Sequence, residues 1–89
     1  MKLIAYADPG HAWLKVPFKL ICKLGIQDKI TSFSYIRRDK SGNINYVYLE
    51  EDCDWAAFAS AFNGTIDFDI RHSNKSSKIR SYEPYSAKG

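Results

Sequence analysis

The sequence predicts a small α+β domain in which two helices pack on one face of an antiparallel sheet. Segments with the alternating pattern of half-buried strands flank two segments with the apolar spacing of helices. The predicted elements follow the order β-α-β-β-α-β, which is that of a split β-α-β layer. With 89 residues, the chain is long enough for one hydrophobic core and too short for two domains. We therefore expect one domain over residues 1–82 and a frayed tail over residues 83–89.

The N-terminal part is expected to form extended chain and the first helix. Residues 2–7 favour a strand, residues 8–10 (Asp-Pro-Gly) favour a turn, and residues 11–16 are extended again. Pro17 suits the first position of a helix, and Gly25 suits the left-handed residue after its last turn. Side chains expected to face the core are Phe18, Leu20, Ile21 and Leu24, and a solvated stripe is expected from Lys15, Lys19 and Lys23.

A hairpin and the second helix follow. Residues 31–38 and 44–50 have the composition of strands, and residues 39–43 that of a loop. Asp52 or Asp54 is expected to cap the next helix, and Gly64 to follow its end. The expected buried face of this helix, at the i, i+3, i+4, i+7 spacing, consists of Trp55, Phe58, Ala59 and Phe62.

The last predicted strand alternates apolar and charged residues, so its Ile66, Phe68 and Ile70 are expected to face the core. If residues 2–16 count as one strand or one hairpin, the elements match a ferredoxin-like arrangement. The polar chain that follows contains three apolar residues that are expected to hold it against the domain: Ile79, Tyr82 and Tyr85.

The charge is unevenly distributed along the chain. The formal net charge is +3, but the residues from Arg71 onward carry five cations and one anion, a net +4, so residues 1–70 carry −1. The densest acidic run is residues 50–54. This pattern does not fit a uniformly anionic DNA mimic. The basic tail instead favours a phosphate-bearing or acidic partner.

The composition points to a protein of the cytoplasm. Cys22 and Cys53 stand alone in the sequence, so we expect free thiols rather than a disulfide framework. No apolar run is long enough for a signal peptide or a membrane span, and we expect no membrane partner.

The second hairpin strand carries the first candidate binding residues. Alternation places Tyr46 and Tyr48 on one face of the sheet, and Val47 and Leu49 on the other, which we expect to be the core. Beside Arg37 on an uncovered sheet face, the two tyrosines can stack a base or a nucleotide-like ligand. The alternative is that they only stabilise the sheet as cross-strand pairs.

Two matters stay open around this hairpin. Arg38 is as close to the tyrosines in sequence as Arg37, and Phe33 and Tyr35 join either the core or the open face, depending on the register. An exposed aromatic face or an unpaired edge strand also allows either a monomer or a homodimer.

The tail carries the second set of candidates. Lys75, Lys78, Arg80 and Tyr82 are able to grip a phosphate or an acidic surface, with Arg80 as a bidentate donor and Tyr82 as a stacking face. Alternatively, Arg80 is an intramolecular clamp, and its possible partners are then Glu50, Glu51 and Asp52.

Candidate catalytic residues are few. His11 lies in a turn-like segment where a histidine can act as an acid or base, but no partner follows at a fixed spacing, so a turn before a buried Trp13 is the simpler interpretation. We therefore expect no enzymatic activity, no catalytic residue and no cofactor, and we count His11 among the candidate binding residues.

We also expect no bound metal. The acidic run of Glu50, Glu51 and Asp52 is of a kind that can bind Mg²⁺, as in a metal-dependent nuclease, but helix capping explains the same residues. A zinc set drawn from His11, Cys22, Cys53 and His72 lacks the paired spacing of zinc motifs.

The middle third of the chain has a partial resemblance to the RNA recognition motif. Residues 42–49 (Gly-Asn-Ile-Asn-Tyr-Val-Tyr-Leu), followed by a helix and Asn63-Gly64, are similar to the third strand, second helix and turn of that family. The resemblance implies an α+β fold with helices on one sheet face.

Three landmarks along nearly the whole chain resemble a family of small proteins encoded by phages and prophages. They are residues 8–17 (Asp-Pro-Gly-His-Ala-Trp-Leu-Lys-Val-Pro), 48–54 (Tyr-Leu-Glu-Glu-Asp-Cys-Asp) and 74–82 (Asn-Lys-Ser-Ser-Lys-Ile-Arg-Ser-Tyr). The resemblance implies a phage accessory protein. Together with the tyrosines and arginines that are expected to be exposed, it leads to the hypothesis of a non-enzymatic protein of the host-cell cytoplasm that inhibits or captures a host or defence factor through its open sheet face and basic tail. The alternative is a nucleic-acid-binding or nucleotide-sequestering protein.

Overall fold

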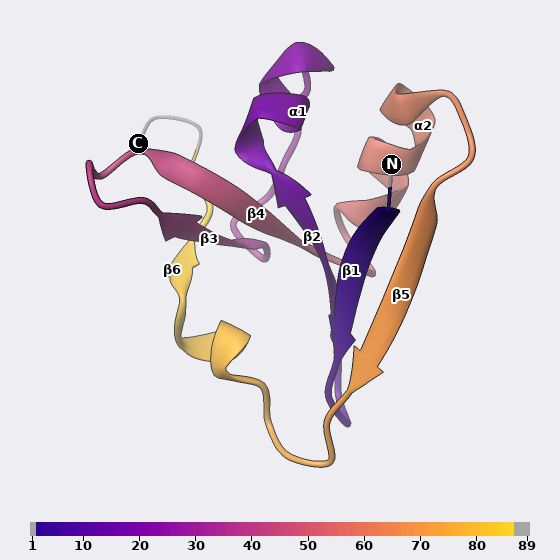
Figure 1. Cartoon of the computed structure of the whole chain (residues 1–89), viewed down its shortest axis with the longest axis vertical. Coiled ribbons are helices and arrows are strands. Elements are labelled where there is room, and N and C mark those ends of the chain that lie inside the picture. The colour runs from indigo at the N-terminus through magenta and orange to yellow at the C-terminus, as the bar shows by residue number, and fades with distance from the viewer. Residues whose placement is uncertain (1, 87–89) are drawn as a thin grey trace.

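The computed structural model describes residues 2–86 and contains one open sheet of six strands, two α-helices and one 3₁₀ helix (Figure 1). Both α-helices lie on the same side of the sheet in Figure 1. In chain order the elements are β1 (Lys2–Ala7), β2 (Ala12–Pro17), α1 (Phe18–Lys23), β3 (Tyr35–Arg38), β4 (Ile44–Glu50), α2 (Trp55–Phe62), β5 (Asp67–His72), η1 (Lys78–Ser81) and β6 (Glu83–Pro84).

The strand order across the sheet is β5-β1-β2-β4-β3-β6. As the sequence predicts, the chain contains a split β-α-β unit. Helix α1 connects β2 to β3, and β4 lies between these two strands and is antiparallel to both. The sheet is mixed rather than antiparallel throughout, because β5 pairs with β1 in parallel. The sheet also differs from a ferredoxin-like order, in which β5 would pair directly with β2, because β1 lies between these two strands.

The turn at residues 8–11 explains this difference. The Asp8 carboxylate accepts hydrogen bonds from the backbone N–H groups of Gly10 and His11, each at 2.9 Å. Such a side-chain-stabilised turn closes a hairpin. β1 therefore folds back along β2 and occupies the edge at which β5 would otherwise pair.

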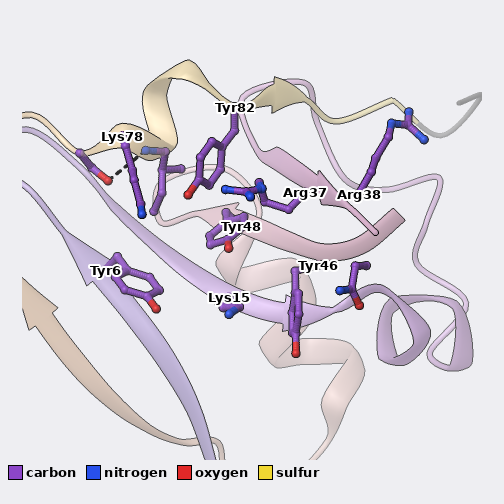
Figure 2. Close-up of a pocket in the computed structure, with 11 residues that line it drawn as sticks. Tyr6, Lys15, Arg37, Arg38, Tyr46, Tyr48, Lys78 and Tyr82 are labelled. Carbon is purple, nitrogen blue, oxygen red and sulfur yellow. Dashed lines mark hydrogen bonds between the residues drawn. The ribbon is translucent and has the colours of Figure 1, made fainter. Parts of the chain in front are cut away.

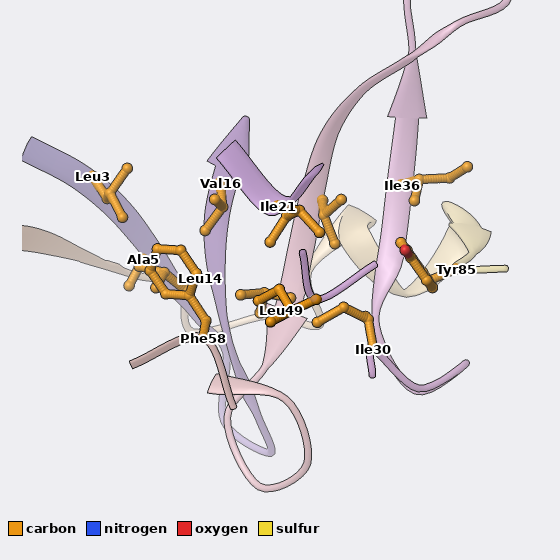
Figure 3. Packing of buried hydrophobic residues seen from close by; sticks show 12 residues of the cluster. Leu3, Ala5, Leu14, Val16, Ile21, Ile30, Ile36, Leu49, Phe58 and Tyr85 are labelled. Atoms are coloured by element: carbon orange, nitrogen blue, oxygen red, sulfur yellow. The ribbon is translucent and has the colours of Figure 1, made fainter. Parts of the chain in front are cut away.

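The main core lies between the sheet and the two α-helices (Figure 3). Alternate residues of the central strands point into it, and Val47 and Leu49 are fully buried, as predicted. From the helices, Ile21 and Phe58 are fully buried against this face. The other strand residues in this core are Leu3, Ala5, Leu14, Val16 and Ile36.

The first helix begins one residue later than expected, because Pro17 is the last residue of β2 and precedes the helix as its N-cap. Gly25 has φ +69° and follows the helix end, as predicted. Lys19 and Lys23 are exposed, but Lys15 belongs to β2 and lies on the sheet face opposite the helices. The expected three-lysine stripe is therefore wrong at Lys15.

Around α2, two expectations about helix ends are corrected. Asp54 occupies the N-cap position, but its carboxylate accepts hydrogen bonds from Thr31 and from the Ser34 hydroxyl instead of capping the helix. These bonds hold residues 31–34 outside the sheet, so β3 begins at Tyr35 rather than at residue 31. At the other end, Gly64 follows the helix as expected, but the left-handed conformation belongs to the C-cap residue Asn63, with φ 52°.

The buried faces of α2 and β5 also differ from the prediction by one residue each. Ala59 is exposed, and Ala61 packs against the core instead. On the edge strand β5, Phe68 packs edge-on against Trp55 with ring centroids 5.2 Å apart, but Ile70 is half exposed. Ile70 was expected in the core, and it faces solvent because its strand extends beyond the part that α2 covers.

The C-terminal segment crosses the opposite face of the sheet and ends along β3 (Figure 1). Ile79 is buried against Trp13 and Tyr48, as predicted. Tyr85 is also buried, and its hydroxyl donates to the backbone oxygen of Gln27 at 2.5 Å. The packed part of the chain thus extends past the expected boundary at residue 82 to Tyr85, whereas residues 87–89 lie outside the described part.

Within residues 2–86, no helix is long and apolar enough to cross a membrane.

Candidate functional site: a tyrosine-arginine groove

The sheet face opposite the α-helices carries an open groove of about 420 Å³, which we call the tyrosine-arginine groove (Figure 2). Four strands form its floor, and the C-terminal segment forms one wall. Its lining consists of Tyr6, Lys15, Arg37, Arg38, Asn45, Tyr46, Tyr48, Ser77, Lys78, Ile79 and Tyr82.

The strand register brings the floor together. Tyr35 is opposite Tyr48 and Arg37 is opposite Tyr46 across the β3-β4 pair, so all four share one face. The register thus places Tyr35 on the open face rather than in the core, and Phe33 is an exposed residue before β3. On the other side of β4, Lys15 of β2 pairs with Tyr48.

Tyr48 forms the closed bottom of the groove. It is 7% exposed, with Tyr82 packed edge-on at a centroid distance of 5.2 Å and Tyr6 at 6.3 Å. Burial, followed by the neighbouring Tyr82 and Tyr6, raises the pKa of Tyr48 to about 12. Its hydroxyl therefore stays protonated at neutral pH. Tyr48 is a structural ring, whereas the half-buried Tyr46 keeps part of its surface open to a ligand.

Cations lie directly over two of the rings. The Lys15 ammonium is 4.2 Å from the centroid of Tyr46, and the Arg37 guanidinium is 4.7 Å from that of Tyr82. Both distances are within the range of a cation–π interaction. Figure 2 shows Tyr82 reaching down towards Tyr48 and Arg37.

The groove is positively charged. Its described lining contains four cationic residues and no carboxylate. Within residues 2–86, Lys15, Arg37 and Lys78 form no ion pair with an acidic side chain. Arg38, in contrast, pairs with Glu83 at 2.9 Å, which raises the pKa of Arg38 and lowers that of Glu83. Unpaired cations in a concave surface concentrate the field on an anionic ligand.

A second, smaller hollow of about 260 Å³ lies beside the first β-turn. The three landmark segments of the sequence converge around it, since His11, Glu50 and Arg80 all line it. The His11 Nδ1 atom is 3.1 Å from a carboxylate oxygen of Glu50. The other lining residues are Trp13, Phe33, Tyr35, Asp52 and Cys53.

Arg80 is an intramolecular clamp, but its partner is Asp8 and not the acidic run around Glu50. The guanidinium binds both carboxylate oxygens of Asp8, with Nε to Oδ2 at 2.7 Å and Nη2 to Oδ1 at 2.9 Å. This pair, opposed by burial and helped by backbone N–H donors, holds the pKa of Asp8 far below its usual range. Gly10 makes room for it, because a Cβ there would lie 2.8 Å from Arg80 Nη2.

The structure brings together five of the eight predicted binding residues in the groove, namely Arg37, Tyr46, Tyr48, Lys78 and Tyr82. Arg80 and His11 line the second hollow instead, and Lys75 is exposed in the loop after β5. Arg38, which the sequence left open beside Arg37, also lines the groove. Five lining residues were not predicted as part of a binding site: Tyr6, Lys15, Asn45, Ser77 and Ile79. Alternation along β1 and β2 is a signal that would have placed Tyr6 and Lys15 on the open face.

Among the described residues, one group of side chains has the proximity of metal ligands. It consists of His11, Glu50 and Asp52, whose candidate ligand atoms all lie within 4.8 Å of one another. Neither the acidic set of Glu50, Glu51 and Asp52 nor a set that includes Cys22 and His72 comes together in this way within residues 2–86.

Comparisons with models of protein families, with curated proteins and with solved structures find no match to this chain.

Proposed function

We propose that the protein is a non-catalytic binding protein whose tyrosine-arginine groove holds a phosphate-bearing aromatic ligand, either a free nucleotide or a nucleotide unit of single-stranded nucleic acid. The observation that carries the proposal is the placement of Lys15 and Arg37, both without an acidic partner in the described chain, directly over tyrosine rings. Such a surface offers stacking and anion recognition within one ligand's reach.

Each part of the ligand has a complementary group in the groove. Tyr46 offers a partly open ring for stacking a base, which is worth roughly 1–3 kcal/mol per base in single-strand-binding proteins. Arg37 and Lys78 supply donors for phosphate oxygens. Asn45 is an exposed amide that can donate to a base edge and accept from it.

The test is a direct titration with two probes, adenosine monophosphate and a short labelled single-stranded DNA. We expect Tyr46→Ala to weaken binding at least roughly fivefold, because a stacking partner is removed. Lys78→Ala is matched by Lys19→Ala, which removes the same charge from the exposed side of α1. We expect only the former to weaken binding.

The salt dependence separates the two sources of the ligand. A polynucleotide loses affinity steeply as salt rises, and Lys78→Ala lowers the slope of log K against log salt by about one. A free nucleotide in a formed site shows tighter binding than the DNA and a weaker dependence on salt. If neither probe binds, or if Tyr46→Ala and Lys78→Ala bind as the parent does, the proposal is wrong.

The second candidate function is the capture of a host or defence protein by a phage accessory protein in the host cytoplasm. The observation that favours it is Phe33, which is 65% exposed beside the second hollow. Large aromatic side chains of this kind are common anchors of protein interfaces. A specific partner recovered from host lysate by the parent chain, and lost with Phe33→Ser, would support this function; equal recovery by both chains would exclude Phe33 as its anchor.

A further inference from the structure

We propose that His11, Glu50 and Asp52 form a binding site for a divalent transition-metal ion, for which zinc is the expected occupant. The site lies in the second hollow and shares no residue with the tyrosine-arginine groove. The proposal is therefore independent of nucleotide binding.

The first argument is distance. Ligand atoms bound at about 2.1 Å to a tetrahedral zinc ion are roughly 3.4 Å apart. His11 Nδ1 and Glu50 Oε1 are already 3.1 Å apart, and the Asp52 ligand atom is within 4.8 Å of both. Since Asp52 is exposed, its side chain is free to turn towards the other two.

The second argument is that the first two ligands are held in place by the surrounding chain. The second carboxylate oxygen of Glu50 accepts from the backbone N–H groups of Asp52 at 2.7 Å and Cys53 at 2.9 Å, which leaves Oε1 directed at the His11 ring. The backbone N–H of His11 donates to Asp8 at 2.9 Å. Metal ligands in proteins are usually oriented by such outer hydrogen bonds.

The third argument is that the buried Glu50 carboxylate has no lysine or arginine partner among the described residues. Its side chain is only 9% exposed, yet within residues 2–86 no lysine or arginine pairs with it. Buried charges are normally paired or coordinated to a metal. Arg80 also lines the hollow, but both oxygens of Asp8 engage its guanidinium.

A fourth observation is a buried hydrogen-bond donor without a partner in a residue that lines the same hollow. Trp13 lines it and is 1% exposed, but its indole N–H has no acceptor among the described residues. Buried donors without acceptors are rare. Three protein ligands leave a zinc ion one open position, which a water molecule commonly fills, and such a water is an acceptor.

The donor set selects the class of ion. An imidazole nitrogen with carboxylate oxygens suits zinc and related transition metals, whereas magnesium prefers oxygen ligands alone. Cys53 is not included, because its sulfur does not belong to the group of ligand atoms that lie within 4.8 Å of one another.

The test is a calorimetric titration of the untagged, metal-stripped chain with zinc. We expect one zinc per chain, and a loss of affinity of at least about tenfold in His11→Ala and in Glu50→Gln. The matched control is His72→Ala, since the chain has only two histidines, and it should bind as the parent does. Absence of binding by the parent, or equal weakening by His72→Ala, overturns the proposal.

Two further measurements keep the proposal testable if a variant fails to fold. In the parent chain, zinc should shift the backbone amide resonances of residues 11 and 50–53 and leave those near His72 unchanged; the reverse pattern overturns the site.

Cys53→Ser and magnesium test the donor set. Retained zinc binding in Cys53→Ser and failure of excess magnesium to compete support it, whereas the opposite result in either experiment overturns it.

Discussion

Arg80 and Asp8 join the two ends of the described chain through a bidentate ion pair that spans 72 positions of sequence. The Asp8 side chain has no solvent-exposed surface, whereas that of Arg80 is 38% exposed. Asp8 also accepts from the backbone N–H of Ser77 at 2.9 Å. One carboxylate therefore fixes both the β1-β2 turn and the C-terminal segment that forms a wall of the groove.

Replacing Asp8 should therefore destabilise the whole domain. We expect Asp8→Ala to lower the free energy of unfolding by about 3 kcal/mol, because a buried, multiply hydrogen-bonded charge is lost and its donors are left without an acceptor. Urea denaturation measures this loss. Asp39→Ala is the control, since Asp39 is exposed in the β3-β4 loop. An equal effect of the two substitutions would show that the Asp8 contacts contribute little.

The same pair predicts how stability depends on pH. The pKa of Asp8 is depressed in the folded chain, so its contribution is complete above its unfolded value of about 3.9 and is lost as the pH falls further. We expect unfolding free energy to decline below pH 4, and Asp8→Asn to decline less. If the unfolding free energies of the parent and of Asp8→Asn fall in parallel as the pH decreases, other carboxylates cause the acid sensitivity.

The buried tyrosines should be visible in an alkaline titration. Burial raises the pKa values of Tyr48 and Tyr85 to about 12, whereas an unperturbed tyrosine ionises near pH 10. The folded chain favours the protonated tyrosine hydroxyls, so the free energy of unfolding should fall as the pH rises from about 10 to about 12. In an absorbance titration of the phenolate, Tyr48→Phe and Tyr85→Phe should each remove one of the two tyrosine ionisations near pH 12. A single transition near pH 10 in the folded parent would contradict both shifts.

Two phenylalanines test the assignment of the core. Phe58 is fully buried beneath the sheet, so Phe58→Ala should cost about 3–5 kcal/mol of unfolding free energy through lost contacts and a cavity. Phe33→Ala is the matched control because Phe33 is 65% exposed, and we expect a change within about 0.5 kcal/mol. Similar losses in both variants would contradict the packing described for α2.

The sequence was most informative where a local rule decides the structure. Alternation placed Val47 and Leu49 in the core, with Tyr46 and Tyr48 opposite, because side chains of a strand point alternately to its two faces. Gly25 was identified correctly as the end of α1, since a left-handed residue there strongly favours glycine. The same alternation accounts for the presence of Tyr46 and Tyr48 in the groove.

Contacts between residues far apart in the sequence account for the features that local patterns did not predict. The position of β1 in the sheet depends on whether β1 or β5 pairs with the edge of β2, which no local pattern records. Asp52 or Asp54 was expected to cap α2, but the Asp54 carboxylate binds Thr31 and Ser34, which lie 23 and 20 positions earlier in the chain. Likewise, Arg80 had several carboxylates within plausible reach, and only the folded turn at Asp8 selects its partner.

The wall of the groove formed by Ser77, Lys78, Ile79 and Tyr82 lies C-terminal to all four strands of the floor. During translation, β1 to β5 emerge from the ribosome before this segment, and N-terminal parts of a chain generally begin to fold first. The nascent chain therefore exposes Trp13 and Tyr48 until residues 77–82 arrive to cover them. A nascent chain that stops short of residue 77 therefore lacks this wall, and its uncovered aromatic surface favours aggregation.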